Sequence, residues 1–338
     1  MNRKTFLWAA LLLTMSIGPL HAQQLKIAAL APDGSSWMEA LKAAGDRIEE
    51  RTDGEVRIRF YPGGVMGDAD TVLRRIRLGQ LQGGVFTVGE LAGIAPESNL
   101  YSLPFQFRRA EELAALREEF DPFILDALYE GGMMAPAISN GGFAYLFSRD
   151  PVTAPDDVSA GLRVWIPEGD ALSRRTLERI GASAVPMSMA EVYTGLQTGT
   201  INTFGSTVSG AIILQWHTRA KYMLDLPVLV TMGTLAIDRD EFEKLDPSHQ
   251  EVVRQQFADA LSSQEAAVVG ENANARQALI EEGIQILQPD PDAVQEWTRL
   301  SNQVLDEMLE DGDFEVPGID RLRERLDAVR ADQEPATP

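Results

Sequence analysis

The sequence predicts an α/β protein of two lobes with a long helix near its end, and three observations support this prediction. Strand-like and helix-like segments alternate over residues 25–87, an order typical of a parallel sheet covered by helices. A second group of such segments begins after residues 140–142. A helical pattern then runs from Asp246 to Gly283 without a clear break. A chain of this length usually needs more than one hydrophobic core, which favours two lobes.

The first unit is expected to contain three strands with a helix in each interval. Ser35 or Ser36 is a suitable N-cap for the first helix, because its hydroxyl can accept a hydrogen bond from a free backbone N–H group. The glycine-rich residues 63–67 are interpreted as a turn, because they lack the lysine that reaches phosphates in a nucleotide-binding loop. The strands are expected at residues 25–30, 56–60 and 83–87, and the second helix runs through residues 72–76.

The second unit also alternates strands and helices. Its clearest boundary is a capping box, with Ser188 at the N-cap and Glu191 three residues later, and Gly199 is a natural end for that helix. Asp246 followed by Pro247 opens the long helix. About 36 helical residues would extend about 54 Å, so we expect this helix to cross both lobes or to bend. The other elements are expected at residues 143–147, 162–166 and 235–237 as strands and 172–180 as a helix.

The first 22 residues have the three zones of a cleavable secretory signal. Arg3 and Lys4 supply positive charge, residues 6–17 are mostly apolar, and the segment ends on the small residue Ala22. The apolar stretch has about 12 residues, fewer than the roughly 20 that span a bilayer, so a membrane anchor is the weaker alternative. Because the chain has no cysteine, it cannot carry the lipid anchor of a lipoprotein, and we expect it to be free in the periplasm.

The composition disfavours several classes of partner. The chain has 30 Lys and Arg residues against 51 Asp and Glu residues, a formal net charge of −21. So acidic a surface argues against nucleic acid and anionic membranes as partners, and it mainly secures solubility. Disulfides cannot form without cysteine, and no later segment is apolar for long enough to insert directly into a membrane.

The sequence contains no recognisable catalytic or cofactor-binding motif. Beyond the N-terminal segment it has two histidines, His217 and His249, and neither lies in a metal-binding pattern such as H-E-x-x-H. It has no G-x-S-x-G nucleophile elbow and no phosphate-binding loop with a terminal lysine. We therefore expect no enzyme activity, no metal and no cofactor.

Several short motifs follow one another in a fixed order: residues 61–64 (YPGG) with 66–67 (MG), 103–105 (LPF), 155–158 (PDDV), 161–164 (GLRV) and 191–199 (EVYTGLQTG). Each motif alone is a weak signal. Their order and spacing together closely resemble the DctP-type solute-binding proteins of TRAP transporters, and the match covers roughly residues 25–308.

This resemblance implies a periplasmic binding protein fold, in which two lobes close on a small organic solute and deliver it to the TRAP permease subunits in the membrane. It also implies that two strands cross between the lobes, near residues 143–147 and 232–237. The expected divisions are residues 23–142 plus about 232–270 for lobe I, 143–231 plus about 271–330 for lobe II, and a disordered tail at 331–338.

The sequence departs from this family at the positions that contact the solute. Trp165 stands where most members carry an arginine that grips the carboxylate of the solute through two hydrogen bonds. Ala144 and Ser206 stand where the family has a second arginine and often an asparagine. A carboxylate beside Trp165 would lack its partner, so we expect an apolar, aromatic or amphiphilic solute. Four further aromatic residues are candidates for the lining: Trp37, Phe86, Phe105 and Trp216.

Three alternatives remain open. The solute could be a carboxylate held by backbone amides or by Arg163, which shares a strand face with Trp165. The protein could instead be a periplasmic adaptor that acts through a partner protein. Finally, residues 34–38 and 210–218 resemble one branch of the family that works with a TPR-repeat periplasmic protein, and His217 could contact the solute in that branch.

Overall fold

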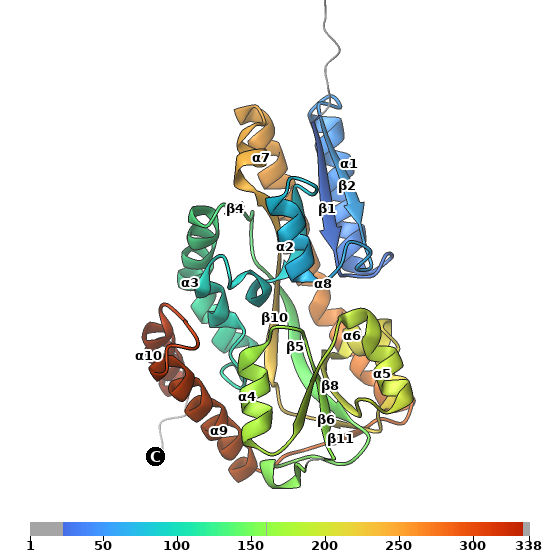
Figure 1. Ribbon diagram of the computed structural model, residues 1–338, viewed down its shortest axis with the longest axis vertical. Helices are drawn as coiled ribbons and strands as arrows, with labels where there is room; N and C mark the ends of the chain where they lie inside the picture. The colour runs from blue at the N-terminus through green and yellow to red at the C-terminus, as the bar shows by residue number, and fades with distance from the viewer. Residues whose placement is uncertain (1–22, 160, 334–338) are drawn as a thin grey trace, which may run out of the picture.

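The computed structural model describes residues 23–159 and 161–333, and Figure 1 shows their arrangement. The expected signal segment, residues 1–22, lies outside the described residues. Eleven strands form one mixed sheet, with the order β2-β1-β3-β10-β5-β8-β6-β7 along its main path. Helices flank this sheet along its whole length (Figure 1). The prediction of an α/β fold is confirmed.

The first half of the sheet follows the predicted order. Ser35 caps the first helix, accepting a hydrogen bond from the backbone N–H of Met38 at 3.4 Å. The first strand pairs in parallel with the second and the third, as expected when helices connect successive strands. These elements are β1 (Gln23–Ala29), α1 (Ser36–Arg51), β2 (Val56–Tyr61), α2 (Ala69–Arg77) and β3 (Gly83–Thr87), followed by α3 (Ala110–Glu130) and β4 (Met133–Met134).

The second half contains the predicted capping box. The Glu191 carboxylate accepts the backbone N–H of Ser188 at 3.2 Å, and this box opens a short 3-10 turn directly before helix α5. Gly199, with φ +80°, ends that helix as expected. The elements of this half are β5 (Ser139–Ser148), β6 (Arg163–Ile166), α4 (Ala171–Arg179), β7 (Ser183–Pro186), α5 (Val192–Thr198), β8 (Thr203–Thr207), α6 (Val208–Ile213) and β9 (Tyr222–Leu224).

Strands β5 and β10 (Leu229–Asp238) join the two halves. They pair antiparallel with each other in the middle of the sheet. Residues 233–237 of β10 also pair with β3, whereas residues 144–148 of β5 pair with β8. Each of these ten-residue strands therefore belongs to both halves of the sheet (Figure 1).

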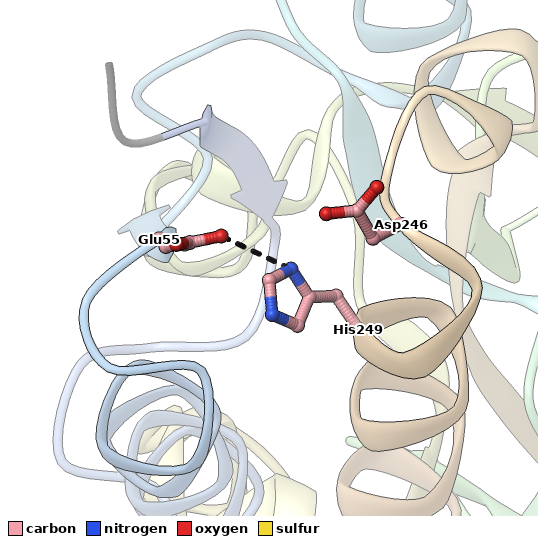
Figure 2. A group of neighbouring side chains, drawn as sticks. All are labelled: Glu55, Asp246 and His249. Carbon is pink, nitrogen blue, oxygen red and sulfur yellow. Dashed lines mark ion pairs between the residues drawn. The ribbon is translucent and has the colours of Figure 1, made fainter. Parts of the chain in front are cut away.

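The long helix is α8 (Pro247–Glu281), preceded by α7 (Arg239–Glu243). Asp246 occupies its N-cap, and Figure 2 shows Asp246 and His249 at the start of the helix. Its 35 residues extend about 52 Å. It packs against α1 in the first half and against β5 and α6 farther along, so one helix supports both halves. No helix among the described residues is long and apolar enough to cross a membrane.

The chain ends with β11 (Gln285–Leu287), α9 (Pro291–Glu310) and α10 (Ile319–Gln333). Helix α10 packs against α3, and its Leu322 and Leu326 share a buried cluster with Phe120 of α3. We expected disorder from residue 331, but α10 extends to Gln333, so this expectation is wrong for the first three residues of the tail. Residues 334–338 lie outside the described residues.

A buried ion pair fastens α10 to α3. Arg330 Nε donates to Glu112 Oε1 at 3.1 Å, and the backbone N–H of Arg108 donates to Glu112 Oε2 at 2.8 Å. The Glu112 side chain is 1% exposed. Burial alone would raise the pKa of Glu112, but the hydrogen bonds from Arg330 and Arg108 outweigh burial and hold this pKa below its usual 4.5.

Glu112 is therefore expected to make the fold sensitive to acid. Because its pKa is lower in the folded than in the unfolded state, its ionised form contributes stability that is lost as pH falls through the folded-state pKa. Replacing Glu112 with Gln should lower the free energy of unfolding by about 1–3 kcal/mol at neutral pH and flatten its further decline in acid. Urea unfolding across this pH range measures both effects. Exposed Glu118→Gln on the same helix should keep the wild-type profile, whereas a Glu112→Gln profile parallel to wild type would contradict the prediction.

Candidate functional site

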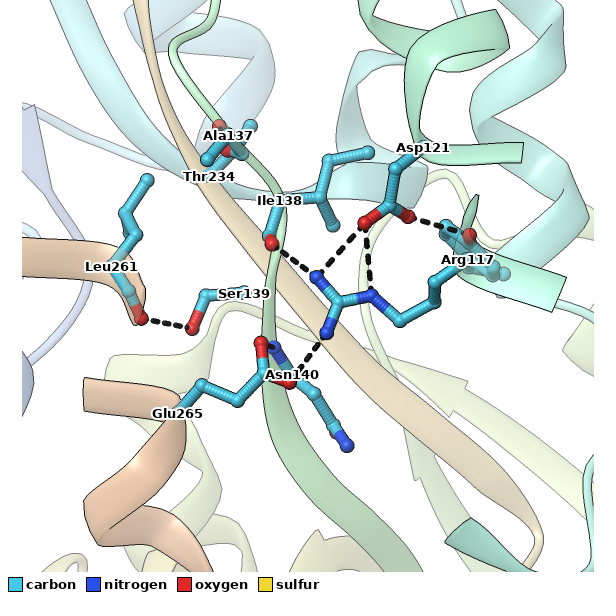
Figure 3. Close-up of polar contacts among 10 residues, drawn as sticks. Arg117, Asp121, Ala137, Ile138, Ser139, Asn140, Thr234, Leu261 and Glu265 are labelled. Atoms are coloured by element: carbon cyan, nitrogen blue, oxygen red, sulfur yellow. Dashed lines mark hydrogen bonds and ion pairs between the residues drawn. The ribbon is translucent and has the colours of Figure 1, made fainter. Parts of the chain in front are cut away.

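A network of charged and polar groups holds the base of the crossing strand β5 (Figure 3). Arg117 of α3 donates to the carbonyl of Ile138 at 2.6 Å and to the carboxylate of Asp121 at 2.8 Å, and it pairs with Glu265 of α8. The second carboxylate oxygen of Glu265 accepts the backbone N–H of Asn140 at 3.0 Å. Arg117 therefore connects α3, α8 and the first residues of the crossing strand.

Two hydroxyl groups hold the neighbouring residues (Figure 3). Ser139 Oγ donates to the carbonyl of Leu261 in α8 at 2.9 Å, and Thr234 Oγ1 of β10 donates to the carbonyl of Ala137 at 2.6 Å. Ser139 and Thr234 are both fully buried, so water cannot readily replace these bonds. Residues 137–140 are thus fixed to three separate elements.

The largely buried carboxylate of Asp121 depends on its hydrogen-bond partners in this network. Tyr101 donates its hydroxyl to Asp121 Oδ1 at 2.6 Å, whereas Arg117 donates to Oδ2. Burial raises the pKa of Asp121, and the hydrogen bonds and charge of Tyr101 and Arg117 oppose that rise. Burial also raises the pKa of Tyr101. Removing Arg117 would leave a desolvated carboxylate without its cation.

Beyond this anchored segment, both crossing strands are irregular. Gly142 of β5 has φ +99°, a conformation that residues with a side chain rarely adopt. The pairing with β10 shifts register at the same place: Val230 pairs with Phe143 and Met232 with Asn140, so Gly141 and Gly142 oppose the single residue Thr231, as in a β-bulge. Gly142 therefore lies within the bulge that interrupts the pairing of the two crossing strands.

Trp165 lies in an aromatic group of the second half. Its ring meets that of Trp216 edge to face, with centroids 5.1 Å apart, and Trp216 meets Phe204 in the same way at 5.5 Å. Trp165 Nε1 donates to the carbonyl of Met187 at 3.0 Å, so its single polar group is already bonded within the protein. Trp216 is buried, whereas Trp165 is partly exposed and presents carbon surface.

Strand register decides which candidate side chains share a face of the sheet. Opposite residues in neighbouring strands point to the same face, and consecutive residues point to opposite faces. Tyr145 pairs with Ser206, and Ala144 pairs with Thr207. Ser206 and Ala144 therefore point to opposite faces. The pairing of β6 with β8 places Trp165 on the face of Ser206, so these two residues are brought to one surface and Ala144 is not.

Trp37 and Phe86 belong to the first half of the sheet. The ring of Trp37 lies over Gly233 of β10, where a side-chain carbon would approach the ring to 2.8 Å. Trp37 is partly exposed. Phe86 is 3% exposed and packs in the core together with Val72, on the other face from Trp37. Phe105 is also buried, and its ring stacks on that of Trp297. The structure therefore places Phe86 and Phe105 in cores and leaves Trp37 accessible.

Arg163 already has partners within the protein. Its Nε donates to the carbonyl of Gly199 at 3.1 Å, and its Nη1 donates to the carbonyl of Gly161 at 3.2 Å. These bonds hold the guanidinium at the C-terminal end of α5. These bonds use two of the five N–H donors of the guanidinium and fix the place of the group.

His217 is held at both ring nitrogens. Its Nδ1 lies 2.8 Å from the carbonyl of Ala211, and its Nε2 lies 2.7 Å from the carboxylate of Glu282. The side chain is buried between the end of α6 and the end of α8. These contacts assign His217 a structural role in joining those two segments.

One pair of carboxyl groups connects the two halves away from the sheet. Asp68, the N-cap of α2, shares a hydrogen bond with Glu168 in the turn between β6 and α4. This bond raises the pKa of Glu168, whereas hydrogen bonds from Thr71 hold the pKa of Asp68 below its usual range.

Two α/β halves that share one sheet and are joined by two crossing strands are the architecture of a bilobal binding protein. The family model described as bacterial extracellular solute-binding protein, family 7 (DctP), matches residues 27–311. The chain belongs to this family.

Relatives and solved structures support the same class. The 2,3-diketo-L-gulonate-binding periplasmic protein YiaO of Escherichia coli is 27% identical over 94% of this chain and 95% of its own. A TRAP periplasmic solute-binding protein from Citrobacter koseri, solved with bound D-glucuronate, has a TM-score of 0.79 at 22% identity and covers 92% of this chain and 100% of its own. One from Ralstonia eutropha, with bound (S)-2-acetolactate, has a TM-score of 0.81 at 20% identity and covers 91% of this chain and 99% of its own. These proteins bind solutes and are not named as enzymes.

Sequence reasoning missed the anchoring network. Arg117 and Glu265 are 148 residues apart, and Glu265 and Asn140 are 125 apart, so no local spacing connects them. The one available signal was the Asn-Gly-Gly run at residues 140–142, which marks the unit boundary but not its partners.

Proposed function

We propose that this protein is the extracytoplasmic receptor of a TRAP transporter and carries an apolar, aromatic or amphiphilic organic solute to the membrane permease. One observation carries the choice of solute. Trp165 stands where the resemblance to the family implies a carboxylate-gripping arginine, and its only N–H group is bonded to Met187. The side chain therefore offers carbon surface and no free donor at this position.

The relatives support the role of receptor, since YiaO is named for a sugar acid and the Citrobacter protein holds D-glucuronate. The ligands named for those two proteins are carboxylates, whereas we propose an apolar, aromatic or amphiphilic solute for this chain. A carboxylate placed against Trp165 would lose hydration without gaining a cation from that side chain, and the guanidinium of Arg163 is held toward the carbonyls of Gly199 and Gly161. An uncharged or mainly apolar portion of a solute gains from the same contact.

We assign the direct contacts to the partly exposed residues Trp37, Trp165 and Ser206. Buried Trp216 supports Trp165 through their edge-to-face ring contact, whereas buried Phe86 and Ala144 are assigned no direct contact with the solute. We further propose a cleft between a first lobe around strands β1–β3 and a second lobe around β6–β8, with Gly142 at the bend. Because α10 packs on α3, we propose that α10 belongs to the first lobe, and not to the second lobe as the sequence analysis expected.

The role of receptor requires the TRAP permease subunits as partners. A TPR-repeat periplasmic protein is a further proposed partner, on the resemblance of residues 34–38 and 210–218. We propose a periplasmic location for the mature chain, with residues 1–22 as the removed signal.

A ligand screen tests the proposed solute class. We expect fatty acids or aromatic compounds to raise the melting temperature of the purified mature protein and hexuronates or dicarboxylates to have little effect. A ligand at about 100 times its Kd would stabilise the fold by about 2.7 kcal/mol, enough for a clear shift. A strong response to a dicarboxylate with none to apolar compounds would contradict the proposal.

Variants of Trp165 sharpen this test. Trp165→Phe should retain the apolar ligand, because it keeps an aromatic surface. Trp165→Arg should weaken it by about tenfold or more and increase the affinity for hexuronates, because it supplies a guanidinium. Isothermal titration calorimetry with the apolar ligand and with a hexuronate measures both changes in affinity. Equal solute affinities for wild type and Trp165→Arg would show that Trp165 does not contact the solute.

A further inference from the structure

A second group of side chains lies far from the crossing strands. Figure 2 shows Glu55, Asp246 and His249 turned toward one another. Glu55 directly precedes β2, and Asp246 and His249 belong to the first turn of α8, so two segments about 190 residues apart in sequence meet here. Their carboxylate oxygens and an imidazole nitrogen all lie within 4.8 Å of one another.

These three side chains have no competing partner among the described residues. His249 Nδ1 lies 3.8 Å from Glu55 Oε2, beyond hydrogen-bond distance, and within residues 23–159 and 161–333 no other ion pair or side-chain hydrogen bond involves the group. Asp246 is the N-cap of α8, yet its carboxylate accepts no capping bond, and its backbone carbonyl accepts the N–H groups of His249 and Gln250. Two carboxylates and an imidazole thus face one point with their lone pairs free.

We propose that Glu55, Asp246 and His249 bind a divalent cation of the zinc class. Zinc takes carboxylate and imidazole ligands at about 2.0–2.2 Å in a tetrahedron, which places neighbouring ligand atoms roughly 3.4 Å apart. The present separations, at most 4.8 Å, exceed this by up to about 1.4 Å, and rotamer changes of the exposed and partly exposed side chains can close that distance. Water would complete the coordination, since the protein supplies three ligands.

The ligand set discriminates between metals. Imidazole favours zinc, copper and nickel, whereas magnesium and calcium prefer an all-oxygen shell with more ligands than these two carboxylates supply. The positive end of the α8 dipole opposes a cation here, but this effect is small at an exposed helix end. The pattern escaped sequence reasoning because Glu55 approaches the helix only in the fold.

The bound ion would fasten an edge of the molecule. Strand β2 is the first strand of the sheet and pairs only with β1 among the described residues, and α8 is the helix that supports both halves. A metal bridge from Glu55 to α8 would stabilise the folded state by mass action. This proposal is independent of the solute and of the permease.

Titration of the tag-free, chelator-treated protein with Zn²⁺ tests the site. We expect one saturable zinc per chain, and with Co²⁺ a visible absorption band typical of low coordination number. His249→Gln and Glu55→Gln should each weaken zinc binding by at least about tenfold. The matched control is Glu251→Gln, which also removes one negative charge and lies two residues from His249. Because Glu251 pairs with Arg254 and not with the proposed site, this variant should bind zinc as the wild-type protein does. Ca²⁺ should give no saturable binding.

Two results would overturn the proposal. One is the absence of saturable zinc binding by the wild-type protein at micromolar to submillimolar concentrations. The other is wild-type zinc affinity in both His249→Gln and Glu55→Gln, which would place any zinc elsewhere. Melting curves recorded in chelator show that the variants are folded, and both side chains are exposed enough for the fold to tolerate their change.

Discussion

Replacing Arg117 with Met is expected to lower the free energy of unfolding by about 2–4 kcal/mol. Arg117 is the cation between Asp121 and Glu265, and it also satisfies the carbonyl of Ile138. The side chains of Arg117 and Asp121 are 20% and 17% exposed, so solvent screens the lost charges only in part. Methionine can fill the space but can neither pair with a carboxylate nor donate to a carbonyl.

Urea unfolding measures this loss. A suitable control is Arg299→Met, which removes an exposed ion pair with Glu296 on α9 and should cost less than about 1 kcal/mol. Hydrogen exchange should show where the structure loosens. We expect the amides of residues 138–140 to exchange faster in Arg117→Met, since this residue fixes the base of the crossing strand. If Arg117→Met is as stable as Arg299→Met, the network does not anchor the strand.

Replacing Gly142 with Ala is expected to destabilise the protein by about 2–3 kcal/mol and to weaken solute binding. The φ of +99° is strained for any residue with a side chain. In addition, a Cβ there would collide with Nδ2 of Asn272 in α8. Asn272 Oδ1 accepts the backbone N–H of Ser209 at 3.2 Å, so displacing Asn272 also loosens α6.

A second glycine separates backbone strain from the collision. Gly132 has φ +94°, and a Cβ there would meet no atom within 4 Å. Gly132→Ala should therefore cost only the strain, about 1 kcal/mol, and leave solute affinity unchanged. The difference between the two variants in urea unfolding and in solute titration isolates the contact with Asn272. Equal effects on solute affinity would argue against a bend at Gly142.

Local sequence signals were sufficient for most elements of the first and second units. Ser35, the box of Ser188 with Glu191, and Gly199 mark helix ends through hydrogen bonds that span at most a few residues. The long helix after Asp246 was recognisable for the same reason. Its length alone left two possibilities, a path across both lobes or a bend, and its packing against α1, β5 and α6 shows that it supports both halves.

The helices after the long one were harder to recognise. α10 has strongly polar composition, and its few apolar residues gain their burial from α3. The sequence around residue 331 therefore resembled a disordered tail, although Arg330 binds the buried Glu112 and the helix continues past it. A helix that depends on a distant partner carries little signal of its own.

The candidate site divides in the same way. Trp165 stands where the family resemblance implies a solute-binding arginine, and the expectation of an apolar solute follows from this difference. Both depend only on residue identity, so they could be stated from the sequence. Which candidates share a surface depends on strand register, which turns Ser206 toward the face of Trp165 and Ala144 away from it. Burial then separates accessible Trp37 from Phe86.

By itself, then, the sequence determined the alternation of strands and helices, their caps and the chemical character of the position at Trp165, because these depend on neighbouring residues or on one side chain. The tertiary structure alone decided the pairing of β5 with β10, the anchor around Arg117 and the meeting of Glu55 with His249. Those contacts join segments more than 80 residues apart, and their free energy exists only once the chain has brought the segments together.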